Sequence, residues 1–138
     1  MALPTKIVLE VVTPMGLLLR EEVEEVIAPG GDGYFGVRPG HTPFLATLGL
    51  GEISYKMGGA WRQLTCFSGF CEVLPDRVNV LAEIGERPED IDLARAQADR
   101  DQALERMKAL RDEEGYQEAH MEYVKSVTRL TVASRPRG

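Results

Sequence analysis

The sequence changes character sharply near residue 85, and this change constrains the fold more than any other feature. Residues 1–85 contain 12 of the 14 glycines, six of the eight prolines and 18 Val, Ile and Thr residues. Residues 86–138 contain only two glycines and are dense in Ala, Glu, Gln, Arg and Leu. Because the first composition favours strands and turns and the second favours helix, we expect a β-rich domain at 1–85 and a helical region at 86–138.

Nine short runs with β propensity lie in the first part, separated by turns rich in glycine and proline. They are 6–12, 16–23, 25–28, 34–38, 44–48, 52–57, 61–67, 70–74 and 77–84. Gly58-Gly59, between 52–57 and 61–67, and Pro75-Asp76, between 70–74 and 77–84, are residue pairs typical of hairpin turns. So many short strands in 85 residues predict a two-sheet β-sandwich.

The second part is expected to form an antiparallel two-helix hairpin, which gives an α+β protein in two parts. Pro88 and the acidic residues after it suit the start of a helix over 91–114, with Gly115 as its C-terminal stop. Apolar residues of the next helix recur at spacings of three and four: Tyr116, Ala119, Tyr123, Val127 and Leu130. Because both apolar stripes are narrow, the hairpin needs the sandwich or another protein for stability, and it can exchange partners.

Charge and hydropathy exclude two classes of function. Sixteen Lys and Arg against 22 Asp and Glu give a net charge of −6, so a nucleic-acid partner is not expected. The longest uncharged stretch, 39–51, is shorter than the roughly 20 apolar residues that a membrane span needs. The N-terminus lacks a basic region followed by an apolar segment, so we expect no export signal.

The motifs of self-contained catalysis are missing from the sequence. It contains no GxxxxGK[S/T], HExxH or GxSxG pattern, and no cluster has metal-ligand spacing. Cys66 and Cys71 lie in apolar runs without a basic neighbour, so we interpret them as reduced core residues rather than nucleophiles. His41 stands in a Pro-Gly-His-Thr-Pro turn, where it fixes the backbone or, alternatively, serves as a ligand or catalytic group.

Three separate blocks carry a resemblance to a known family. Residues 33–48 (GYFGVRPGHTPFLATL) resemble the pattern GxxGxxPGHAPLLTxL, and 68–82 (SGFCEVLPDRVNVLA) resemble GGFVEVxxxxVTVLA. Residues 86–96, which end in Ile-Asp-Leu-Ala-Arg-Ala, resemble the start of the same family's helical hairpin. The family is the epsilon subunit of bacterial F-type ATP synthases, and the resemblance covers essentially the whole chain. It implies a sandwich of about ten strands followed by a two-helix hairpin.

The resemblance also implies a non-catalytic rotor subunit at the cytoplasmic face of the bacterial inner membrane. In the family, the sandwich binds the gamma subunit and its loops rest on the ring of c subunits, so the subunit meets the membrane only through the complex. The implied c-ring contacts in this sequence are Gly31, Tyr34, Arg38 and His41. Tyr34 replaces a residue that is often acidic in the family, which exchanges charge attraction for apolar contact.

The hairpin of the family can also extend into the catalytic head and inhibit ATP hydrolysis. The basic residues that would meet the alpha and beta subunits there are Lys125, Arg129, Arg135 and Arg137. The alternative is that these cations only complement the C-terminal dipole of the second helix.

Some members bind ATP through an [IL]DxxRA motif, which is fully present at 91–96. The implied contacts are Glu86, Ile91, Asp92, Arg95, Ala96, Lys125 and Arg129. ATP would then be a regulatory ligand rather than a required cofactor. The alternative is that Asp92 and Arg95 form an ordinary ion pair in the first helical turn. A different class of function, a free-standing nucleotide-binding sandwich with a helical lid, remains open.

Overall fold

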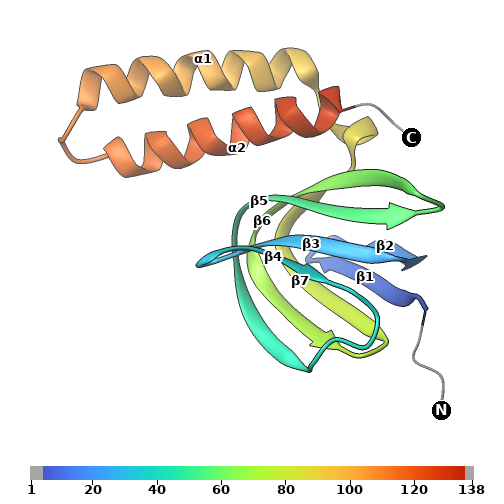
Figure 1. Ribbon diagram of the computed structural model, residues 1–138. Helices are drawn as coiled ribbons and strands as arrows, with labels where there is room; N and C mark the ends of the chain where they lie inside the picture. Colours follow the sequence, from blue (N-terminus) through green and yellow to red (C-terminus); the bar gives the residue numbers. More distant parts are fainter. Residues whose placement is uncertain (1–4, 136–138) are drawn as a thin grey trace.

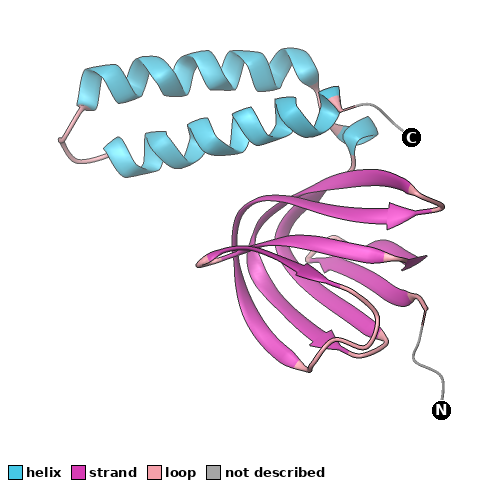
Figure 2. Cartoon of the chain, viewed as in Figure 1, coloured by secondary structure: helices cyan, strands magenta, loops and turns pink. Residues whose placement is uncertain are grey.

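A computed structural model of the chain describes residues 5–135. The strands are β1 (Ile7–Thr13), β2 (Gly16–Val23), β3 (Glu25–Gly30), β4 (Gly33–Val37), β5 (Phe44–Met57), β6 (Ala60–Leu74) and β7 (Arg77–Glu86). A 3₁₀ turn η1 (Pro88–Asp90) leads into α1 (Leu93–Leu110) and α2 (Tyr116–Ser134). Strands fill one part of the molecule and an antiparallel helical hairpin fills the other (Figures 1 and 2).

The strands form one hydrogen-bonded sheet in the order β2-β1-β7-β6-β5-β3-β4, which folds over into two layers. The pair β1–β7 is parallel and the other neighbours are antiparallel. β7 pairs with β6 from Thr65 to Leu74, whereas β3 pairs mainly with the other end of the β5–β6 hairpin, at residues 54–56. The two layers therefore share β5 and β6, and one apolar core lies between them.

The described residues form seven strands rather than the nine runs, or about ten strands, expected from the sequence. The expected strands 44–48 and 52–57 are one strand, β5, and 61–67 and 70–74 are one strand, β6. The small residues read as breaks lie inside these strands, where Ser68 and Gly69 adopt φ of 66° and 138°. Small residues inside a strand let it bend at a barrel or sandwich corner without ending it.

Both predicted two-residue hairpins are confirmed by the strand register. Met57 pairs with Ala60 around Gly58-Gly59, and Leu74 pairs with Arg77 around the second turn. Gly58 and Gly59 have φ of 56° and 81°, the two positive values that a type I′ turn requires.

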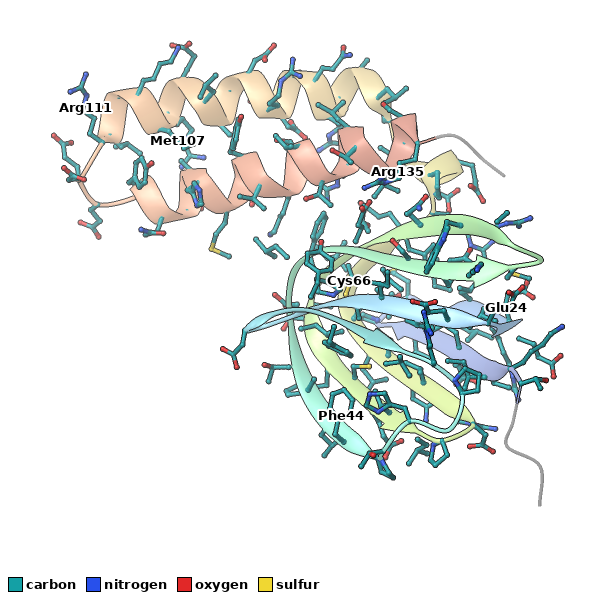
Figure 3. All side chains as sticks on the ribbon, viewed as in Figure 1. Glu24, Phe44, Cys66, Met107, Arg111 and Arg135 are labelled. Atoms are coloured by element: carbon teal, nitrogen blue, oxygen red, sulfur yellow. The ribbon has the colours of Figure 1, made fainter. Side chains whose placement is uncertain are left out.

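The core holds the two free cysteines, as the sequence predicts. Cys66 and Cys71 are both fully buried and belong to the apolar cluster between the layers. Figure 3 shows Cys66 among the strands. Burial raises the pKa of each thiol to about 12. Neither thiolate is populated near neutral pH, so neither side chain is suited to nucleophilic chemistry.

The helix limits differ from the prediction at both ends of the first helix. It spans Leu93–Leu110 rather than 91–114, because the Asp92 side chain accepts a hydrogen bond from the Arg95 backbone N–H and so caps the start. Arg111, with φ of 43°, ends the helix. Gly115 has φ of 93° and stands at the N-cap of α2, so its predicted role as the stop of the first helix is wrong.

The hairpin packs on the sandwich mainly through α2, while α1 lies on the far side of α2 (Figure 1). Small side chains are buried within the hairpin: Ala96, Ala103, Ala119 and Ser126. Val132 of α2 is buried near the sandwich. The buried residues of both helices are thus few and mostly small. Within 5–135, no helix is long and apolar enough to cross a membrane.

Candidate functional site

An ion pair joins the end of the sandwich to α2 and unites two of the predicted nucleotide contacts. Arg129 Nε lies 2.9 and 3.1 Å from the two carboxylate oxygens of Glu86. Thr65 donates its hydroxyl proton to the same carboxylate at 2.9 Å, and the Arg129 guanidinium lies 5.1 Å from the centre of the Phe67 ring. The two charged side chains are only 22% and 27% exposed, so water screens this pair less than a surface pair.

A second ion pair joins the C-terminal end of α2 to the sandwich. The Arg135 guanidinium donates through Nε and Nη2 to the Glu52 carboxylate, and this hydrogen bonding raises the pKa of Arg135. The Glu52 backbone N–H in turn donates to the Tyr34 hydroxyl oxygen at 3.1 Å. Figure 3 shows Arg135 between the end of α2 and the strands. Tyr34 therefore lies on the side of the sandwich that faces this end of the hairpin.

The other predicted nucleotide contacts, those of the [IL]DxxRA motif at 91–96 and Lys125, make local contacts in this conformation. Asp92 caps α1 through the Arg95 backbone N–H, whereas the Arg95 side chain is 80% exposed and lies 3.9 Å from Asp99. The alternative of an Asp92–Arg95 side-chain ion pair is therefore wrong. Ala96 is buried between the helices and Ile91 is half-buried. Lys125 lies 3.6 Å from Glu122 on its own helix rather than beside Glu86.

The basic residues considered for the catalytic head are engaged inside the chain. Lys125 pairs with Glu122, Arg129 with Glu86 and Arg135 with Glu52. Arg137 lies outside the described residues. Two of these three pairs connect α2 to the sandwich, so release of the hairpin would free two guanidinium groups at once.

The predicted c-ring contacts divide between two parts of the sandwich. His41 Nδ1 is 2.8 Å from the Thr42 carbonyl oxygen and its ring lies 5.2 Å from that of Phe44, which Figure 3 places at the end remote from the helices. Arg38 is 80% exposed and lies 3.4 Å from Glu25. Gly31, at the β3–β4 turn, donates its backbone N–H to Thr47 at 2.9 Å. Tyr34 is separate from the His41 loop and packs against Glu52.

An outward-facing apolar row crosses the sandwich, and sequence reasoning missed it. In the strand register, Leu17 pairs with Val12, Val12 with Leu81, and Leu81 with Phe70, so these four side chains share one face. Leu17, Phe70 and Leu81 are 61%, 62% and 59% exposed. A strictly alternating strand with a solvated face carries polar residues there. Leu81 and Phe70 are apolar residues at outward-facing positions of their strands. This break in the alternation of apolar and polar residues was the signal in the sequence that could have revealed the row.

No group of three or more His, Cys, Asp and Glu side chains within residues 5–135 is arranged to hold a metal ion.

Family comparisons account for almost the whole described chain. The model "ATP synthase, Delta/Epsilon chain, beta-sandwich domain" matches residues 6–88, and "ATP synthase, Delta/Epsilon chain, long alpha-helix domain" matches residues 89–134. The chain belongs to the ATP synthase delta/epsilon family. The resemblance found in the sequence blocks is thereby confirmed, as is the predicted sandwich followed by a helical hairpin.

Curated members of this delta/epsilon family are similar over nearly their full length. The ATP synthase epsilon chain of Syntrophobacter fumaroxidans is 42% identical over 130 residues, which are 94% of this chain and 97% of that protein. The ATP synthase epsilon chain 2 of Syntrophotalea carbinolica is 44% identical over 131 residues, 94% of this chain and 95% of that protein.

A solved structure shares the fold at lower identity. A chain in the Euglena gracilis mitochondrial ATP synthase matches with a TM-score of 0.80 and 21% identity, over 98% of this chain and 85% of that one. A chain in the Tetrahymena thermophila mitochondrial ATP synthase central stalk and c-ring matches with a TM-score of 0.57 and 11% identity, over 96% of this chain and 100% of that one. At these identities the likeness bears on the fold alone.

Proposed function

We propose that the chain is a non-catalytic central-stalk subunit of a proton-translocating F-type ATP synthase, where it couples rotation of the c-ring to the gamma subunit. Family membership over both parts of the chain carries this proposal. The names of the two related structures, which are ATP synthase assemblies with a c-ring, support it. Such a subunit is held at the cytoplasmic face of the bacterial inner membrane by the complex and needs no cofactor of its own.

The outward apolar row is the surface that we assign to the gamma subunit. Leu17, Leu81 and Phe70 are large apolar side chains, each more than half exposed, on β2, β7 and β6, and Val12 of β1 lies between Leu17 and Leu81. A contiguous apolar patch of this kind on a small soluble domain usually marks a protein interface. Gamma is the partner that the family assigns to the sandwich.

Co-purification tests this assignment. The chain should elute with the gamma subunit in an equimolar complex, and Phe70→Asp or Leu81→Asp should weaken the complex by at least about tenfold, since a carboxylate would be buried against apolar surface. Met121→Asp, at another exposed apolar residue, is the matched control and should leave binding unchanged. Tight ATP binding by the isolated chain with no gamma complex would instead support the free-standing nucleotide module.

For the c-ring we propose the four residues that the family pattern implies: Gly31, Tyr34, Arg38 and His41. The His41 loop lies at the end of the sandwich remote from the hairpin, and Arg38 is largely exposed. A single cysteine at 41 should cross-link to the ring in the assembled complex, and a single cysteine at 34 tests whether the contact extends to the part of the sandwich beside Glu52. The native cysteines are buried with raised pKa values, so they will not compete. Failure of both cysteines to cross-link would remove the c-ring assignment.

For regulation we propose that the hairpin leaves the sandwich and inhibits ATP hydrolysis at the alpha and beta subunits. The two interdomain pairs, Arg129–Glu86 and Arg135–Glu52, support an exchange of acidic partners, because release makes both cations available. Arg137 and Lys125 belong to the same basic set. Hydrolysis by the reconstituted complex should rise when residues 86–138 are deleted, and an unchanged rate would refute inhibition.

We propose that ATP binding at the [IL]DxxRA motif modulates the release of the hairpin from the sandwich. Glu86 and Arg129 lie together beside the start of α1, but a nucleotide phosphate would have to compete with Glu86 for the Arg129 guanidinium. We therefore expect weak binding, and Asp92→Ala or Arg95→Ala to reduce it by about 1–3 kcal/mol. Calorimetry that detects no heat at millimolar ATP would end this part of the proposal.

A further inference from the structure

A cleft of about 300 Å³ lies at the junction of the sandwich and the hairpin, apart from the nucleotide motif. The cleft opens beyond the end of β7. β6 pairs with β7 only from Thr65 onward, so residues 61–64 of β6 have no β7 neighbour and line the cleft. The opposite wall comes from β2, and η1 and the end of α2 complete the site. None of the residues proposed for ATP lines this junction cleft.

One side of the junction cleft is apolar and aromatic. Its apolar lining consists of Leu19, Tyr55, Met57, Trp61, Leu64 and Val132. Trp61 is the one tryptophan of the sequence and is half-buried. An aromatic wall of this kind favours the flat or aliphatic body of a small molecule.

The charged lining is richer in cations than in acids, although the chain as a whole carries −6. Three arginines, Arg62, Arg87 and Arg135, face two glutamates, Glu21 and Glu89. Arg135 is already paired with Glu52, which lies outside the lining. Arg62 is exposed and forms no ion pair with any residue of the described chain. Among residues 5–135 no carboxylate neutralises the Arg62 guanidinium, so a monoanion could pair with it.

Arg87 supplies the second cation and an unmet hydrogen-bond donor. Its Nη2 donates to the Leu18 carbonyl oxygen, but its Nε is buried and has no hydrogen-bond partner among residues 5–135. A buried donor without a partner costs free energy, so native proteins rarely keep one without a ligand, a water molecule or a functional reason. Arg87 lines the junction cleft, so a small rotation of its side chain would let this Nε donate to an acceptor bound there.

We propose that the junction cleft binds a small organic anion, specifically a carboxylate with an apolar or aromatic body. The carboxylate accepts hydrogen bonds from Arg62 and Arg87, and the body packs on Trp61. Arginine suits this role because its planar fork matches the two oxygens of a carboxylate. A volume of about 300 Å³ suits a molecule of a dozen or so heavy atoms, at the small end of ligand sites.

Binding at this place is coupled to the hairpin. Val132 of α2 and Arg135, directly after this helix, form part of the lining, so the junction cleft is complete only while α2 lies on the sandwich. A ligand that binds the docked form alone must stabilise it. This site goes beyond the proposed stalk function and does not depend on the ATP motif or on the gamma subunit.

The test compares three probes of one shape on the full chain: 4-phenylbutyrate, 4-phenylbutan-1-ol and 4-phenylbutylamine. Trp61 fluorescence, excited beyond the absorption of tyrosine, should change saturably with the carboxylate. The alcohol and the amine should bind at least about tenfold more weakly. Arg62→Gln should weaken phenylbutyrate binding about fivefold or more. Arg106→Gln removes an exposed arginine of α1 outside the cleft and should change the affinity less than about twofold.

Three results would overturn the proposal. Equal affinity for the three probes would indicate adventitious hydrophobic binding. Equal effects of Arg62→Gln and Arg106→Gln would place the anion elsewhere, and no saturation at millimolar phenylbutyrate would exclude the site. In support, phenylbutyrate should slow amide hydrogen exchange in α2 of the wild type and have little effect in Arg62→Gln, a readout that is independent of gamma binding.

Discussion

Replacement of Arg129 by alanine should loosen the hairpin from the sandwich more than any other single change in α2. The Arg129 Nε donates to both oxygens of Glu86 at 2.9 and 3.1 Å, and its guanidinium lies 5.1 Å from the Phe67 ring centre. A hydrogen bond between charged groups contributes about 1.5–3 kcal/mol and a cation–π contact about 0.5–2. The two charged side chains are 22% and 27% exposed, so water screens their attraction. We therefore take the combined contribution of the hydrogen bonds and the cation–π contact to be about 2–3 kcal/mol.

Amide hydrogen exchange in α2 measures this loss directly, since exchange there reports opening of the hairpin. A change of about 2–3 kcal/mol corresponds to exchange about 30- to 160-fold faster in Arg129→Ala. Arg129→Lys keeps the charge without the two-oxygen geometry and should fall between wild type and alanine. The control, Lys108→Ala, removes an exposed pair with Glu105 at 3.5 Å and should accelerate exchange less than about threefold.

Exchange in Arg129→Ala that rises less than about threefold, or no more than in Lys108→Ala, would refute the reasoning. Apolar contact at Val132 and Phe67, rather than the charged pair, would then hold α2 in place.

Three further predictions concern stability. Gly69→Ala places a Cβ 2.0 Å from a backbone oxygen of β7 at φ of 138° and should lower the free energy of unfolding in urea by about 3 kcal/mol. Gly36→Ala, which meets open space, should change it by less than about 1 kcal/mol; equal effects would contradict the argument. Burial raises the thiol pKa values of Cys66 and Cys71 from 9.0 to about 12, so stability is complete below pH 9 and falls as the pH rises toward 12. Urea titrations should show a slope of about 1.4 kcal/mol per pH unit and thiol, and Cys71→Val should reduce it; an unchanged slope would contradict this origin. Asp92→Ala removes the cap of α1 and should lower the free energy of unfolding of the helical hairpin by about 1 kcal/mol, measured from thermal melting followed by circular dichroism. An unaltered melting curve would show that the cap is dispensable.

Local sequence chemistry was sufficient to predict the turns and the division of the chain. Gly58-Gly59 forms the expected turn because the required positive φ values are a local property of glycine. The same rule misplaced strand ends at Gly49, Gly51 and Gly69, since a glycine that bends a strand has the same sequence signature as one that ends it. Gly115 was assigned to the wrong helix for a similar reason, because a left-handed residue in a short connection can serve either helix.

The candidate sites were predictable only where their residues are close in sequence. The [IL]DxxRA motif was visible because it occupies six consecutive residues. The pairs Glu86–Arg129 and Glu52–Arg135 span 43 and 83 residues, so they depend on how α2 docks. The junction cleft likewise joins five elements, β2, β5, β6, η1 and α2, and nothing in the vicinity of Trp61 or Arg87 in the sequence indicates it.

The two bent strands shared by both layers have a mechanical consequence. β5 and β6 are hydrogen-bonded to each other along almost their whole length, and one end of this ribbon carries β3 and β4 while the other carries β7, β1 and β2. Torque applied at one layer thus reaches the other through unbroken backbone, and slippage between the layers would require the ribbon itself to tear. The helical hairpin lies outside this ribbon and is attached to it by one strand end and a few side chains, so its release would leave the hydrogen bonds of the ribbon intact.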